Sequence, residues 1–155
     1  MTLLKAELEL RHYHAGDFES LAPFMRDTDK RVFIPGMEKV FKYLDDSHTG
    51  DTVTFILGGD VVAIGTVMQV WAGVGHAYLI TTDKIVGLGK RFTELSATAL
   101  DRWHEDFGFR RIQCDCLADF DKSLVYLGRL GFVNEGRMDH YFPNGDDGVR
   151  LARFR

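Results

Sequence analysis

The sequence predicts an α/β fold in which a mixed, mostly antiparallel sheet carries helices on both faces. The main observation is the stretch 76–107, where a short β-branched and aromatic segment is followed by a glycine-bearing turn and then by apolar residues at helical spacing. A second strand pattern follows at 111–117, and a strand–helix–strand crossover makes these two strands parallel. A hairpin pattern at 52–70 supplies antiparallel neighbours.

The first third of the chain is expected to hold one strand and two helices. Residues 8–13 have the composition of a strand, and Asp17 is expected to cap a helix with Phe18, Leu21 and Met25 on one side. Pro23 lies inside that pattern, so this helix is kinked or begins late. Residues 26–31 are expected to form a charged connection. Pro35 then opens a second helix, with its apolar positions at Met37, Val40, Phe41 and Leu44.

The middle of the chain is expected to form three antiparallel strands joined by short turns. The hairpin consists of a strand at 52–57, a glycine turn at 58–60 and a return strand at 61–70. Gly65 in the return strand indicates a β-bulge. A second glycine-bearing turn at 71–75 leads into the strand that begins at His76.

The last third alternates helices and strands. The helix after the glycine turn begins near Lys90 and ends at Gly108, and its buried stripe comprises Phe92, Leu95, Ala99 and Trp103. Asp119 or Asp121 is expected to cap a shorter helix that ends at Gly131. Residues 132–141 and 149–154 are expected to form a final strand pair.

Composition indicates a single domain spanning residues 1–155. The chain is 45% apolar with twelve phenylalanines, so it can bury a substantial core, and it has no apolar run long enough to cross a bilayer. The formal net charge of −4 argues against nucleic acid as a partner. Cys114 and Cys116 cannot build a disulfide framework and the histidines are scattered, so we expect a reducing, cytoplasmic location and no metal site.

The turn at 84–91 has the composition of a phosphate-binding loop. Gly87 and Gly89 let the backbone approach a ligand, and the N–H groups that begin a helix attract anions. Lys84, Lys90 and Arg91 add positive charge. The alternative is an ordinary strand-to-helix turn with solvated basic residues, and the turn by itself does not separate the two interpretations.

The order of elements resembles that of the GNAT superfamily of N-acetyltransferases over nearly the whole chain. Lys84-x-x-Gly87-x-Gly89 is similar to the Gln/Arg-x-x-Gly-x-Gly/Ala pattern on which these proteins bind the pyrophosphate of acetyl-CoA. Ser123 and Leu130-Gly131-Phe132 are similar to a second family segment. The resemblance implies an acyl-CoA-dependent N-acyltransferase that uses acetyl-CoA as co-substrate and an amine as acceptor.

The same resemblance implies which residues meet the acyl-CoA. The pantetheine arm would lie where the fourth and fifth strands splay apart, beside Leu79, Ile80 and Thr81, whose backbone could hydrogen-bond the thioester carbonyl. The pyrophosphate would lie on the turn, where Leu88 joins the glycines and the three basic residues, and Ser123 would lie nearby. The acceptor side would be built from residues 26–46 and 142–148.

Two positions depart from the family pattern. Phe120 stands where asparagine is expected, and Leu127 stands where many members have the tyrosine that protonates the leaving thiolate. Tyr126 is next to it in sequence but about 100° away around the helix, so we do not expect a direct substitution.

A general base is also hard to identify. Many relatives use a glutamate on the third or fourth strand, but residues 61–82 contain no acidic residue, which leaves His76 and Tyr78 as candidates there. His76 is either this base or a packed strand residue, and Cys114 or Cys116 could instead act as a nucleophile or fill the core. We therefore expect the rate to depend on pH mainly through the amine.

A narrower likeness is to the acetyltransferase-like internal virion and morphogenesis proteins of short-tailed phages. Residues 78–83 and 123–127 are similar to segments of those proteins. This likeness implies an alternative function as a catalytically degenerate phage structural or assembly protein. Its partners would be other virion proteins or a second copy in a homodimer, and its location the host cytoplasm or the virion.

Overall fold

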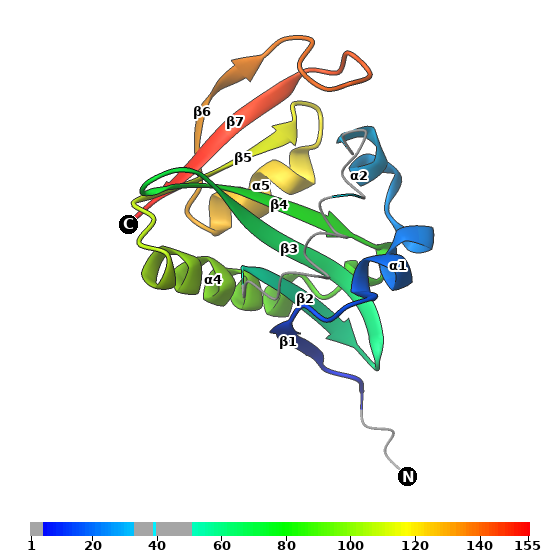
Figure 1. Ribbon diagram of the computed structural model, residues 1–155. Helices are drawn as coiled ribbons and strands as arrows, with labels where there is room; N and C mark the ends of the chain where they lie inside the picture. The colour runs from blue at the N-terminus through cyan, green and yellow to red at the C-terminus, as the bar shows by residue number, and fades with distance from the viewer. Residues whose placement is uncertain (1–4, 33–38, 40–50) are drawn as a thin grey trace.

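The computed structural model describes residues 5–32, 39 and 51–155, which form one seven-stranded sheet with helices against it (Figure 1). The strands are β1 (Leu8–His12), β2 (Thr52–Leu57), β3 (Asp60–Trp71), β4 (Val74–Thr81), β5 (Arg111–Leu117), β6 (Val133–Met138) and β7 (Gly148–Phe154). The α-helices are α1 (Asp17–Leu21), α2 (Asp27–Val32), α4 (Gly89–Asp106) and α5 (Asp121–Arg129), and the short 3-10 helices are η1 (Ala22–Phe24) and η2 (Asp83–Ile85).

The sheet has the order β1-β2-β3-β4-β5-β7-β6. The pairing of β4 with β5 is parallel, and the other pairings are antiparallel. The crossover through α4 produces the parallel pair, because a strand, a returning helix and a second strand place both strands in the same direction. The prediction of a mixed, mostly antiparallel α/β sheet is confirmed.

Helices cover both faces of the sheet, as the sequence predicted. Successive strand residues point to opposite faces, so Ala63 and Val67 pack in the main core with the inner side of α4, whereas Ile64 packs with Leu21 and Met25 on the α1 side. The main core therefore lies between the sheet and α4 with α5. A smaller core lies under α1 on the other face.

The N-terminal third differs from its prediction in two ways. Asp17 is the first residue of α1 and not its cap, and its buried carboxylate accepts hydrogen bonds from Arg11, the His14 N–H and Thr54. Residues 26–31 were expected to form a charged connection, but all of them except Arg26 belong to the helix α2, which has acidic residues in its first turn, basic residues in its last turn and no apolar stripe. The helix expected after Pro35, with Met37, Val40, Phe41 and Leu44, lies outside the described residues.

The bulge predicted at Gly65 is wrong. The register of β3 passes through Gly65 without a shift, and the irregularities lie between Phe55 and Ile56 and between Gln69 and Trp71. At the start of α5 the cap position is Phe120 and not an aspartate. None of the described helices is long and apolar enough to span a bilayer.

Candidate active site

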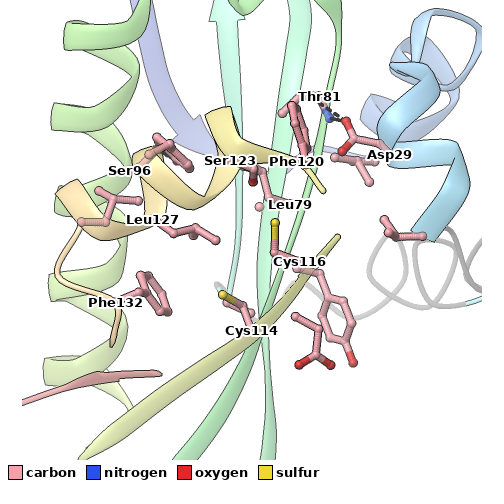
Figure 2. Close-up of a pocket in the computed structure, with 18 of the residues that line it drawn as sticks. Asp29, Leu79, Thr81, Ser96, Cys114, Cys116, Phe120, Ser123, Leu127 and Phe132 are labelled. Carbon is pink, nitrogen blue, oxygen red and sulfur yellow. Dashed lines mark hydrogen bonds between the residues drawn. The ribbon is translucent and has the colours of Figure 1, made fainter. Parts of the chain in front are cut away.

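The central feature of the molecule is the gap between β4 and β5. These parallel strands pair only at Val74–Arg111, Gly75–Ile112 and His76–Gln113, and beyond His76 they diverge. A cleft of about 1290 Å³ occupies the divergence and is lined by β4, β5, α4, α5 and part of α2. Figure 2 shows Leu79 of β4 and Cys116 of β5 on its two sides. A ligand can therefore lie between two strands of the sheet.

Backbone groups of β4 face this gap. The Thr82 N–H donates to the Val62 carbonyl of β3, and N–H groups alternate sides along a strand, so those of Leu79 and Thr81 point toward the gap. The Thr81 N–H donates to Asp29 Oδ2 at 2.9 Å, and the Thr81 hydroxyl donates to the same oxygen (Figure 2). The Leu79 N–H is thus the group placed to polarise a carbonyl in the gap, whereas the N–H of Ile80 points to β3.

The turn before α4 brings two glycines to the end of the cleft. Gly87 has φ +84°, a conformation that favours glycine, and a Cβ built at Gly87 or Gly89 would meet no atom within 4 Å. Both residues line the cleft, and α4 begins at Gly89, so the first N–H groups of an 18-residue helix are directed there. This end of the cleft combines exposed backbone donors with room for a ligand.

The basic residues of the turn lie outside the lining of the cleft. Lys84 Nζ lies 2.8 Å from Asp60 of the β2–β3 hairpin, and Arg91 lies 3.7 Å from Glu94. Lys84, Lys90 and Arg91 are exposed, Leu88 is half-buried, and none of the four lines the cleft. A phosphate at the helix start would first meet backbone N–H groups, with these cations at the periphery.

His76 lies where the two strands begin to diverge, beside Asp115 of β5. His76 Nε2 is 3.7 Å from Asp115 Oδ2, and His76 Nδ1 is 3.3 Å from the Gln113 amide nitrogen. Asp115 also accepts hydrogen bonds from Arg150 and, at 2.7 Å, from the Tyr141 hydroxyl. These residues line the cleft and join β4, β5, β7 and the loop after β6.

Burial sets the proton state of this cluster. It lowers the pKa of His76, while the nearby Asp115 carboxylate raises it and Arg150 lowers it, and the net direction is downward. His76 is therefore neutral at pH 7 and able to accept a proton. Tyr78 lies next to it, with ring centroids 4.8 Å apart, and burial raises the pKa of the Tyr78 hydroxyl.

Tyr126 lines the cleft from α5 but is directed toward α4. Its hydroxyl donates to Ser96 Oγ at 2.6 Å, the Ser96 hydroxyl donates to the Phe92 carbonyl, and the Tyr126 ring stacks on Phe92. Burial raises the pKa of Tyr126 far above its ordinary value. These contacts make Tyr126 a wall of the cleft and a poor acid for a thiolate.

Ser123 and the two cysteines lie on the side of the cleft toward α5 (Figure 2). Burial raises the pKa of Cys114 well above its ordinary range. Burial also raises the pKa of Cys116, although a hydrogen bond with the Ser123 hydroxyl lowers it in part. Both thiols stay protonated at neutral pH, so the alternative of a cysteine nucleophile loses support. Across the described residues no group of three or more His, Cys, Asp or Glu side chains could hold a metal ion.

Sequence reasoning missed the polar groups that converge from distant segments. Asp115 and Arg150 are an adjacent pair in the β5–β7 register, and Asp29 comes from α2. The alternation in residues 111–117 was a usable signal for Asp115, because it places Gln113 and Asp115 on the face opposite the cysteines. The prediction placed the base on the third or fourth strand, whereas Asp115 is on β5.

No family model matches the sequence, and no curated protein matches it. Solved structures do match. An acetyltransferase of the GNAT family from Bacillus anthracis has a TM-score of 0.73 at 19% identity, covering 97% of this chain and 96% of that one. Ribosomal-protein-S5-alanine acetyltransferase from Vibrio fischeri has a TM-score of 0.75 at 16% identity, covering 95% and 92%.

A third structure, ribosomal-protein-alanine N-acetyltransferase from Brucella melitensis, has a TM-score of 0.74 at 13% identity and covers 95% of this chain and 99% of its own. Nothing in these comparisons supports the narrower likeness to phage proteins. The identities are low, so what they share with this chain is the arrangement of the backbone. The chain has the fold of the GNAT acetyltransferases.

Proposed function

We propose that this protein is an acyl-CoA-dependent N-acyltransferase, which moves an acyl group from the thioester of acyl-CoA to an amine. The observation that carries the proposal is the Leu79 N–H, which faces a cleft leading to the glycine turn at the start of α4. A thioester carbonyl and an anionic group at opposite ends of one extended molecule would match these two sets of donors. The GNAT fold of the chain supports the same chemistry.

In this proposal the amine nitrogen attacks the thioester carbon, a C–N bond forms and the C–S bond breaks. The Leu79 N–H stabilises the carbonyl oxygen as it gains charge. The proton released by the amine passes to His76, directly or through one water, and Asp115 stabilises the imidazolium that forms. The CoA thiolate needs no acid to leave, because a thiol has an ordinary pKa of about 8.5 and its thiolate is a moderate base.

The donor side and the acceptor side then occupy different parts of the cleft. Acyl-CoA would lie along the gap from Leu79 toward Gly87 and Gly89. The amine would approach the face that holds His76 and Asp115, between α2 and the loop after β6. Arg31 of α2 joins these two walls through Asp146, with nitrogen–oxygen distances of 2.7 and 2.9 Å.

A non-catalytic protein that retains acyl-CoA binding is the second candidate. Leu127 and Phe120 favour it, because they replace the family tyrosine and asparagine in the cleft wall. The two candidates make different predictions for turnover but the same prediction for binding.

The test is to measure acetyl-CoA binding by calorimetry and then thiol release with a panel of primary amines. Binding with amine-dependent release of CoA supports the acyltransferase. Binding without release across the panel supports the non-catalytic candidate, and absence of binding at millimolar acetyl-CoA overturns both.

A further inference from the structure

Three exposed side chains of apolar or aromatic character line the cleft on the side of His76. Met68 and Val70 of β3 are 44% and 42% exposed, and Tyr141 of the loop after β6 is 46% exposed. Single exposed apolar residues are common on protein surfaces, but several in one cleft indicate a binding surface. Because these side chains are accessible to solvent, a ligand can reach them without any rearrangement of the core.

This apolar surface lies beside the residues that are proposed to take the proton of the amine. Met68 pairs with His76 in the antiparallel β3–β4 register, so the two side chains share a face of the sheet and their Cβ atoms lie about 5 Å apart. The Tyr141 hydroxyl donates to Asp115 Oδ2, which is 3.7 Å from His76 Nε2. Since β4 lies between β3 and β5, an amine at His76 has Met68 on one side and Tyr141 on the other.

The charged groups that line this side of the cleft are already paired. Among the described lining residues of β3, β4, β5, β7 and the loop after β6, the charged side chains are Asp115 and Arg150. Arg150 donates hydrogen bonds to both oxygens of Asp115. The two charges therefore offset each other, and neither is free to select an oppositely charged group on the acceptor.

The charged groups at α2 are engaged as well. Arg26 Nε lies 3.5 Å from a carboxylate oxygen of Asp83, and Asp29 accepts both Thr81 hydrogen bonds. A second ammonium group or a carboxylate on the acceptor would have to compete for these partners, and taking a charge out of water without a partner is costly. An acceptor whose remaining atoms are apolar avoids that cost.

We infer that the acceptor is a primary amine with an apolar alkyl or aryl group, which packs against Met68 and Tyr141 while its nitrogen lies at His76. The inference rests on the proposed function and names the class of its acceptor. The flexible Met68 side chain can adapt to either kind of group, and the Tyr141 ring offers a flat apolar surface. Polyamines and amino acids are expected to be poor acceptors, because their second charged group would meet no free partner.

The experiment measures CoA release from acetyl-CoA with ethylamine, hexylamine, 1,5-diaminopentane and 5-aminopentanoate. The last three have similar lengths and differ at the far end, which is a methyl, an ammonium or a carboxylate group. Ethylamine and hexylamine have nearly the same pKa, so at one pH the same fraction of each is neutral. We expect kcat/KM for hexylamine to exceed that for each of the others by about tenfold or more, because one buried methylene contributes up to about fourfold.

Met68→Gln and Tyr141→Ser remove apolar surface from opposite sides of His76. Each should lower the ratio of kcat/KM for hexylamine to that for ethylamine by about threefold or more. Tyr141→Phe keeps the ring and should keep the preference, although it loses the hydrogen bond to Asp115. Val133→Gln is the matched control and should keep the preference too, because Val133 is 56% exposed on β6 and does not line the cleft.

Methyl NMR of the methionines gives a second reading that needs no turnover. With CoA present, hexylamine should shift the Met68 signal, identified by its absence in Met68→Gln, and 1,5-diaminopentane should not. Equal kcat/KM for hexylamine and ethylamine, or a Met68 signal that does not move, overturns the inference and leaves acyl transfer standing. A preference that survives both Met68→Gln and Tyr141→Ser also overturns it. If no amine releases CoA, the proposed function falls and the inference falls with it.

Discussion

His76 Nε2 lies 3.7 Å from Asp115 Oδ2 at the point where β4 and β5 separate. The two residues are on neighbouring parallel strands and share the face away from α4, where an acceptor amine would arrive. Asp115 is held by Arg150 and Tyr141, so its carboxylate has a defined position. This pair supplies the acidic group that is absent from residues 61–82, and it changes the expected pH behaviour.

We expect His76→Gln to lower kcat by about 10²–10⁴-fold, the range for loss of a general base, with the Kd of acyl-CoA unchanged. Because burial lowers the pKa of His76, the wild-type rate should fall only as pH drops below about 6.5, the ordinary histidine value. That acidic limb should vanish in His76→Gln. Rates from pH 5 to 8 with a fixed concentration of neutral amine test this.

Asp115→Asn should lower kcat nearly as much, and the double variant should be no worse than the stronger single one, because residues that act as a unit are not additive. Thermal unfolding of each variant is the control, since Asp115 also pairs with Arg150. Independent, multiplicative losses would show that the two residues do not act together.

Gly87→Glu should abolish acyl-CoA binding and leave the fold intact. The new carboxylate would occupy the space beside the first N–H groups of α4, where a phosphate is expected. The cost in stability is about 1–2 kcal/mol, because Gly87 has φ +84° and any side chain there is strained.

Gly59→Glu is the matched control for that variant. Gly59 has φ +87° and equally open space, but it lies in the β2–β3 turn and does not line the cleft. Both variants should lose similar stability in urea, and only Gly87→Glu should lose binding in calorimetry. Equal binding in the two variants would place the phosphate site elsewhere.

The layout of the fold could be predicted from sequence because it depends on local patterns. The strand–glycine turn–strand pattern in residues 52–70 and the apolar stripe from Phe92 to Trp103 are each readable from neighbouring residues, and the crossover rule then gives the parallel pair. α2 was missed because four of the six residues of Asp27–Val32 are charged, so the segment carries no apolar period.

The site was harder to predict because it depends on which residues of distant segments become neighbours. His76 and Asp115 are brought together by the three-residue pairing of β4 with β5, and no local pattern specifies that register. Gly65 was interpreted as a bulge, but it pairs in register with Val53 and Leu79 and lines the cleft. A glycine within a strand pattern is compatible with a β-bulge or with close packing, and the sequence does not distinguish the two.

His104 should make the protein less stable in mild acid. It is 3% exposed, its Nδ1 is 2.7 Å from the Phe109 carbonyl oxygen, and its Nε2 has no partner among the described residues. Burial lowers the pKa of His104 despite that hydrogen bond. Below pH 6.5 the unfolded chain therefore binds a proton that the folded protein does not, and the free energy of unfolding falls with pH, by at most about 1.4 kcal/mol per unit for one group.

Urea unfolding between pH 8 and 5 measures this slope, and His104→Gln should reduce it. Burial also lowers the pKa of His76, so His76 adds to the same decrease in stability at acidic pH. The slope measured for His76→Gln shows how much of the decrease comes from His76. An unchanged slope in the variant lacking both histidines would assign the acid sensitivity to other groups.

The last prediction concerns Asp29, which joins α2 to the end of β4. Asp29→Ala should destabilise the protein by about 1–3 kcal/mol, because the Thr81 N–H and hydroxyl both lose their acceptor. Asp29→Asn should be neutral or stabilising at pH 7. An amide oxygen can accept the same two hydrogen bonds, and the variant removes a charge that burial disfavours.

The pKa of Asp29 determines how its contribution to stability changes with pH. Burial raises this pKa, although the two Thr81 hydrogen bonds lower it in part. A carboxyl whose folded pKa is raised binds its proton more readily in the folded state, so wild-type stability from this group increases as pH falls toward its ordinary value near 4. Asp29→Asn should lack that increase. Urea unfolding of wild type, Asp29→Asn and Asp29→Ala at pH 7 and pH 4.5 separates the hydrogen bonds from the charge. If Asp29→Asn is as damaging as Asp29→Ala at pH 7, the carboxylate charge itself holds α2 in place, and our account of this contact is wrong.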